Sequence, residues 1–262
     1  MTSTSAKSIA NKLTTQRRID LAKRRMSRVI DHVLHSIALH ESNEFVLYSD
    51  VLSSQISNSH AGHTFNLMRD SLFRYGVIRL CALWDIDKDL EYESISTVVE
   101  LIDDHEVILA LMRETCGQWA GRASHVLNLP DEPELAKEVL RLSQESDDRF
   151  GRQQAVMAAK SLLRTIALAR RVCASDDMKV IRQLRNKHLA HSLNETREEK
   201  LIGPIRQMKY REETELLKKA ISIAGDLHCW VNGASFDFDF SRKMRREQSE
   251  ALWKGTTFKS LR

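Results

Sequence analysis

Glycine and proline are scarce in this chain of 262 residues, and that scarcity most restricts how it can fold. The sequence holds 9 glycines and 3 prolines. Both residues weaken helices, proline by about 3 kcal/mol in a helix interior, so a chain with few of them favours long helices. Apolar residues make up 42% of the sequence and charged residues 29%. This balance is typical of a globular protein with a packed core.

The spacing of apolar residues predicts an all-α, multi-helix bundle. One helix is expected over residues 6–40, and the most apolar helix, over residues 62–85, is expected at the centre. The last long helix is expected to end at Gly233, and the tail after it to be irregular. In domain terms, we expect three parts: a helical N-terminal extension (1–58), a helical core (59–235) and a basic C-terminal tail (236–262).

Charge is distributed unevenly along the chain. Basic residues gather in residues 7–28 and 242–262, whereas residues 85–106, "DIDKDLEYESISTVVELIDDHE", are acidic. The basic ends suit a phosphate backbone. They equally suit the acidic segment of a partner subunit, or a face that is simply solvated. The sequence leaves these three interpretations open.

The sequence favours a soluble, cytoplasmic protein. It has no run of 18 or more apolar residues that would span a membrane, and its first residues lack the apolar core of a signal peptide. The four cysteines are scattered without a CxxC pair, which indicates free thiols in a reducing compartment. The two HxxH pairs, His60 with His63 and His188 with His191, have no cysteine or carboxylate at a convincing spacing. We therefore expect no metal and no cofactor.

The stretch "VIRQLRNKHLAHSLNE", residues 180–195, places charged groups where a helix should be apolar. Ser175 is the expected N-cap of its helix. At about 100 degrees per residue, Arg185, His188 and His191 fall on the apolar side of that helix. A buried unpaired arginine is costly, so this pattern predicts a polar cleft or a wet subunit interface. Separate pairing of the arginine with a carboxylate and of each histidine with its own partner accounts for the same residues.

The string Arg185 to His191, "RNKHLAH", resembles the signature of the HEPN superfamily of all-α domains. That signature is an arginine, four to six residues, then a histidine, often with a polar residue directly after the arginine. Here five residues intervene and Asn186 is the polar follower. The form "LRNKHLAH" and the earlier stretch "RDSLFRYGVIRLCALWDIDKDLEYESISTVVELI" are most similar to the abortive-infection, U-type (AbiU-like) group. The resemblance covers roughly residues 60 to 235.

The resemblance implies a metal-independent endoribonuclease that acts in phage defence or as a toxin. The RNA 2′-hydroxyl would attack the phosphate, leaving a 2′,3′-cyclic phosphate and a 5′-hydroxyl. His191 would be the general acid or base, Arg185 would hold the phosphate, and Asn186 would orient the motif. Arg182, Lys187 and His188 would contact RNA.

The resemblance also implies partners. The motifs of two copies would meet in one composite cleft of a homodimer, with an antitoxin or another defence protein as a further partner. Some HEPN toxins are silenced by modification of a tyrosine two residues after the histidine; Leu193 stands there, so that route is not expected. Two alternatives remain: a non-catalytic HEPN-type protein that binds nucleic acid or a protein partner, and a structural helical bundle.

Overall fold

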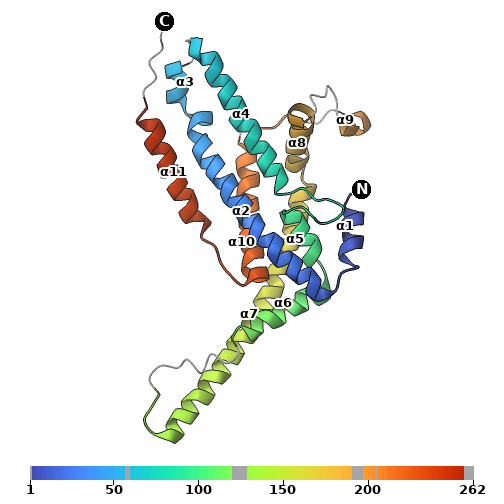
Figure 1. Cartoon of the computed structure of the whole chain (residues 1–262), viewed down its shortest axis with the longest axis vertical. Coiled ribbons are helices and arrows are strands. Elements are labelled where there is room, and N and C mark those ends of the chain that lie inside the picture. Colours follow the sequence, from blue (N-terminus) through green and yellow to red (C-terminus); the bar gives the residue numbers. More distant parts are fainter. Residues whose placement is uncertain are drawn as a thin grey trace.

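A computed structural model describes residues 2–56, 60–119, 129–190, 197–203, 206–209 and 211–256 of the chain. Over these residues it is a helical bundle without strands, which confirms the all-α prediction (Figure 1). Its elements are α1 (Thr2–Ala10), α2 (Thr15–Tyr48), α3 (Asp50–Ile56), α4 (His60–Ala82), α5 (Ile95–Ile102), α6 (His105–Gly117), α7 (Pro133–Ala174), α8 (Asp176–Leu184), a π-helix (Arg185–Ala190), α9 (Arg197–Ile202), α10 (Glu212–Asn232) and α11 (Phe238–Lys254). No helix among them combines the length and the apolar character needed to cross a bilayer.

Helix α2 lies at the centre of the bundle. It packs against α4, α5, α6, α10 and α11 (Figure 1). The expectation that residues 62–85 form the central helix is wrong, because α4 leaves Leu67, Tyr75 and Ile78 exposed. The apolar residues of α4 are spread around the helix, and neighbours cover only part of its circumference. The buried residues of α2, such as Met26, Val29 and Val33, instead form one stripe.

The N-terminal residues form two helices where one was expected. Helix α1 ends at Ala10 and α2 begins at Thr15. Thr14 adopts extended backbone angles, and its hydroxyl accepts a hydrogen bond from the Arg17 N–H. A threonine in this role satisfies a helix-terminal donor, so it starts a new helix within an otherwise continuous apolar pattern.

The C-terminal tail, expected to be irregular, forms α11. The carboxylate of Asp237 accepts from the Phe240 N–H at 2.9 Å and caps the helix. Arg242 and Arg246 of α11 donate to the two carboxylate oxygens of Glu41 on α2 at 3.1 and 2.9 Å. Helices α1, α2, α3 and α11, which lie within residues 1–58 and 236–262, therefore pack in the same bundle as the described helices of residues 59–235.

Arg18, one of the basic residues of the N-terminal stretch, is buried in the core at 4% exposure. Its Nε and Nη2 donate to the carbonyl oxygens of Leu101 and Glu100, at 2.8 and 3.2 Å. Its Nη1 pairs with Asp104 at 3.1 Å. The guanidinium thus lies at the negative end of the α5 dipole and joins α2 to α5 and α6.

We expect Arg18→Ala to lower the free energy of unfolding by about 3 kcal/mol, because removal of one partner strands buried acceptors and Asp104. Urea unfolding followed by circular dichroism measures the change. Arg17→Ala is the matched control, since Arg17 is exposed on the same turn of α2. Equal losses in the two variants would contradict this role of Arg18.

Candidate functional site

Helix α8 carries the first half of the motif and begins as the sequence predicts. The Ser175 hydroxyl accepts from the Met178 N–H, and Asp176 and Asp177 occupy the first turn. The apolar side of α8 is buried, including Met178, Val180 and Ile181. This face packs the helix onto the core and so fixes where the residues after it emerge.

From Arg185 the backbone widens into a π-helix that runs to Ala190. Hydrogen bonds in a π-helix join residues five apart, so each residue advances by less than the 100 degrees of an α-helix. The expected sides of the helix therefore do not hold beyond Leu184. Single π-helical turns are rare, and in many proteins they lie at functional sites.

Arg185 is half-buried, at 23% side-chain exposure, between two polar partners. Its Nη1 forms an ion pair with the Asp85 carboxylate, and its Nε donates to Asn186 Oδ1 at 3.1 Å. Its Nη2 has no hydrogen-bond partner among the residues that the structure describes. Asp85 lies three residues after the end of α4, and sequence reasoning missed it. A half-buried arginine needs a carboxylate partner, and this need was the only sequence signal for Asp85. It does not identify the partner, because the two residues are 100 positions apart.

Arg182 binds backbone carbonyl groups. Its Nη2 donates to the oxygen of Trp84 at 2.9 Å and its Nη1 to the oxygen of Cys173 at 3.3 Å. These bonds tie α8 to the ends of α4 and α7. Arg182 also lines a cavity of about 280 Å³, together with Trp84, Ser96, Arg170 and Cys173. The described cavity thus lies next to Arg182, and Arg185 is not one of its lining residues.

Lys187 pairs with Glu199 of α9 at 3.1 Å, and Glu199 is buried at 8% exposure. This ion pair joins the two described elements on either side of residues 191–196. His191, the expected acid or base, lies outside the described residues, as does the side chain of His188. The structure therefore brings together Arg182, Arg185 and the two residues after it, and leaves the histidines unplaced.

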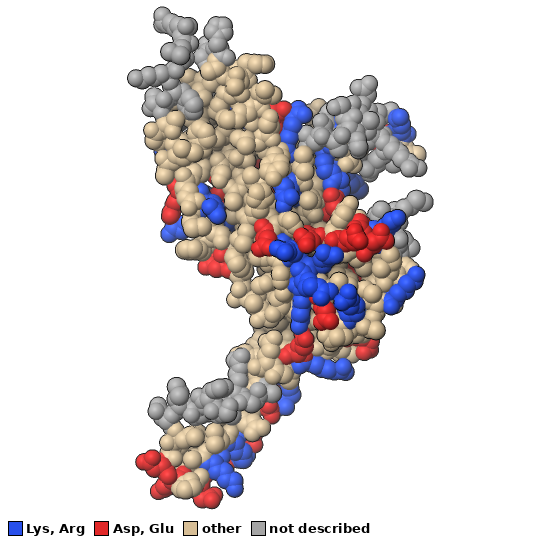
Figure 2. Space-filling model, viewed as in Figure 1, with Lys and Arg blue, Asp and Glu red and all other residues tan. Residues whose placement is uncertain are grey.

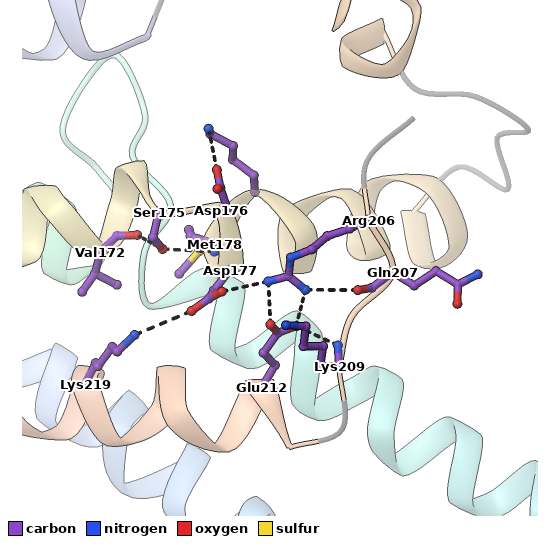
Figure 3. Close-up of polar contacts among 11 residues, drawn as sticks. Val172, Ser175, Asp176, Asp177, Met178, Arg206, Gln207, Lys209, Glu212 and Lys219 are labelled. Atoms are coloured by element: carbon purple, nitrogen blue, oxygen red, sulfur yellow. Dashed lines mark hydrogen bonds and ion pairs between the residues drawn. The ribbon is translucent and has the colours of Figure 1, made fainter. Parts of the chain in front are cut away.

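Figure 3 shows a second polar cluster, centred on Arg206, which holds the start of α8. Arg206 Nη2 donates to Asp177 at 2.8 Å and to Glu212 at 2.5 Å, and its Nη1 donates to Glu212 at 2.9 Å. Lys219 of α10 lies 3.7 Å from the other oxygen of Asp177. The hydrogen bond from Arg206 lowers the pKa of Glu212. This cluster, which sequence reasoning also missed, anchors α8 and residues 206–209 to the first turn of α10.

Two other reactive groups have structural explanations. Burial raises the pKa of the Cys81 thiol to about 12, and its sulfur lies 3.7 Å from the carbonyl oxygen of Ile181, so it packs as a neutral group. His40, Glu41 and Glu44 place possible ligand atoms within 4.8 Å of one another. Both oxygens of Glu41, however, accept from arginines of α11. The guanidinium groups neutralise the charge that a cation would need.

Comparison with known proteins supports the resemblance carried by the motif. Residues 20–252 match the family model described as HEPN_AbiU2, AbiU2. The comparisons with curated proteins and with solved structures found no match. The matched span includes the motif and most of the helices α2 and α11.

We expect Glu212→Gln to lower stability in a pH-dependent manner. A carboxylate whose pKa is depressed in the fold stabilises it above its usual pKa of 4.5, and that contribution disappears as pH falls through the lower folded value. The difference in unfolding free energy between wild type and Glu212→Gln should be full at neutral pH and shrink below pH 4.5, as measured by urea unfolding. Glu91→Gln removes an exposed carboxylate without a described ion pair and serves as the control. A pH-independent difference for Glu212→Gln would refute the contribution of the Arg206 cluster.

Proposed function

Because the chain belongs to the AbiU2 family of HEPN proteins, we propose that it is a metal-independent endoribonuclease that acts in phage defence or as a toxin. RNA supplies its own nucleophile, the 2′-hydroxyl next to each phosphate. Cleavage then needs a base for that hydroxyl, an acid for the 5′-oxygen and positive charge at the phosphate. His191 is the proposed acid or base, since imidazole titrates near neutral pH.

The observation that carries the proposal is the way in which Arg185 is held. Asp85 and Asn186 occupy its Nη1 and Nε, so the guanidinium plane is fixed, while Nη2 has no partner within the described part of the chain. A fixed fork with donors to spare is suited to a phosphate that gains charge during the reaction. In this proposal Asn186 orients Arg185, and Arg182, Lys187 and His188 are secondary RNA contacts.

We further propose that two copies meet through the exposed side of α4. Leu67, Tyr75 and Ile78 are exposed there, and exposed apolar groups on one helix are typical of protein interfaces. Helix α4 also contacts the π-helix, so a two-fold axis at this surface would bring two motifs together. An antitoxin or another defence protein is a further proposed partner.

One observation favours the alternative of a non-catalytic HEPN protein that binds nucleic acid or a protein. Arg185 and Lys187 each pair with a carboxylate, Asp85 and Glu199 respectively. Charges satisfied in this way also occur in purely structural networks. The cleavage assay below separates the two functions.

We expect the purified protein to cleave RNA in the presence of excess EDTA. Arg185→Ala should lower the cleavage rate about 10²- to 10³-fold, because charge stabilisation at the phosphate is lost. His191→Ala should lower it about 10²- to 10⁴-fold through loss of proton transfer. Rates come from a labelled RNA resolved on a gel, with end-group analysis for the 2′,3′-cyclic phosphate.

Lys179→Ala is the matched control for the cleavage assay. Lys179 is exposed on α8 and pairs with Asp176 within its own helix, so its removal leaves the motif intact. Wild-type rates in all three variants would overturn the assignment of Arg185 and His191. RNA binding without cleavage by the wild type would favour the alternative function.

We expect Leu67→Lys combined with Ile78→Lys to convert a dimer into a monomer, since each places a charge in the proposed apolar interface. Sedimentation velocity at micromolar concentration measures the change. Leu142→Lys is the control, because Leu142 is similarly exposed on the part of α7 that projects from the bundle (Figure 1). An unchanged sedimentation coefficient in the double variant would exclude this surface.

A further inference from the structure

The first part of the acidic segment forms an ordered loop that follows α4. Residues 85–93, here called the acidic loop, carry five carboxylates and one lysine. Leu90 adopts left-handed backbone angles and buries its side chain in the core. The Asp87 carboxylate accepts from the backbone N–H groups of Asp89 and Glu91. These contacts anchor the loop to the core and to itself.

The two ends of the acidic loop lie together. The Ile95 N–H donates to the carbonyl oxygen of Leu83 at 2.9 Å, and the Ser94 hydroxyl donates to the carbonyl oxygen of Asp85. Asp85, the partner of Arg185, is therefore next to Glu93. One closed loop thus carries both Asp85, which pairs with Arg185 of the motif, and Glu93, which pairs with arginines of α2.

Glu93 lies against a group of arginines, here called the cationic face: Arg25 and Arg28 of α2, and Arg79 of α4, which is connected to Glu93 through His32. Arg25 and Arg28 lie 3.7 and 4.0 Å from Glu93. Arg79 donates to His32 Nδ1 at 2.8 Å, which places the His32 proton on Nε2, 3.3 Å from Glu93. Figure 2 shows, on the face of the molecule drawn there, a band of acidic side chains beside a gathering of basic ones.

Positive charge exceeds negative charge on the cationic face. Three guanidinium groups, those of Arg25, Arg28 and Arg79, lie beside two carboxylates, Glu93 and Asp31. Arg28 is 65% exposed, whereas the Nε atoms of Arg25 and Arg79 are buried and have no partner in the described structure. Burial, and to a smaller extent the charge of Arg79, lowers the pKa of the neighbouring His35.

We propose that the cationic face is a binding site for the phosphate backbone of RNA, in which phosphate groups replace Glu93 as the partner of Arg25 and Arg28. The inference rests on the proposed function, because it supplies the path by which the RNA reaches Arg185. Glu93 holds the arginines in place in the free protein, and the RNA competes for them. The site contacts the backbone and so binds RNA irrespective of base sequence.

The test is fluorescence anisotropy with a labelled 2′-O-methyl RNA oligonucleotide, which lacks the nucleophile and is bound without being cut. Loss of one phosphate contact to a single strand lowers the salt slope of log K by about 0.7, which corresponds to about fivefold weaker binding at 0.1 M salt. We expect Arg28→Gln to show both changes. Arg141→Gln, which removes the same charge from the exposed, self-paired part of α7, should show neither.

A second pair of variants, each of which removes one negative charge, completes the experiment. Glu93→Gln should tighten RNA binding severalfold, because the competitor is removed. Glu91→Gln makes the same change of charge two residues away, on an exposed side chain without a described ion pair, and should have a smaller effect. Equal effects within both pairs would overturn the inference, because they would reflect overall charge alone.

The outcomes also separate the inference from the proposed function. Cleavage that depends on Arg185, with equal RNA affinity in Arg28→Gln and Arg141→Gln, supports the nuclease and overturns the cationic face. Selective loss of affinity in Arg28→Gln without any cleavage of ordinary RNA supports the cationic face and overturns the nuclease. Absence of RNA binding by the wild type overturns both and favours an acidic protein partner for these arginines.

Discussion

The geometry of the motif depends on the hydrogen bonds that the backbone carbonyl group of Trp84 accepts. Trp84 is fully buried, and its oxygen accepts both from Arg182 Nη2 at 2.9 Å and from the Ser96 hydroxyl at 2.7 Å. One acceptor with two lone pairs thus fixes the end of α4, the start of α5 and the middle of α8 relative to one another. Asp85 is the next residue, so its carboxylate meets Arg185 because Trp84 is held. The ion pair at the motif is therefore a consequence of core packing, and Arg182 contributes to it without touching it.

Several basic residues of the two chain ends form ion pairs with carboxylates of the same chain. Arg18 pairs with Asp104, Arg25 with Glu93 and Arg242 with Glu41, so both basic ends meet carboxylates of the same molecule. From the sequence, the basic ends could face a phosphate backbone, an acidic partner subunit or solvent. The fold brings distant segments together and so adds a fourth possibility, which is pairing with carboxylates of the same chain. Buried pairs such as that of Arg18 hold helices together. The exposed and incompletely neutralised arginines are the ones available to a ligand, since their desolvation is cheaper and their partners exchange more readily.

The sequence predicted the helical class, the Ser175 cap and the buried side of α8, because each depends on residues close in the chain. It did not predict the π-helix, since the apolar pattern of one short turn cannot distinguish bonds to the fourth residue from bonds to the fifth. The pairing of Asp85 with Arg185 also requires the tertiary fold, because loop closure over 100 residues leaves no local signature. The sequence predicted an irregular tail where α11 forms, and the Asp237 cap marks the start of that helix.

The chemistry proposed for Arg185 depends on its being an arginine. A guanidinium has five donors in one plane, so Nε can bind Asn186 and Nη1 can bind Asp85 while Nη2 stays available. The two protein partners fix the plane, and the phosphate is then met by a group whose orientation is already set. An ammonium group has three donors on a freely rotating terminus and cannot divide them among three fixed directions in one plane. The same geometry reconciles the ion pair with catalysis, because Asp85 binds Nη1 and Asn186 binds Nε, so neither need leave when a phosphate oxygen approaches Nη2.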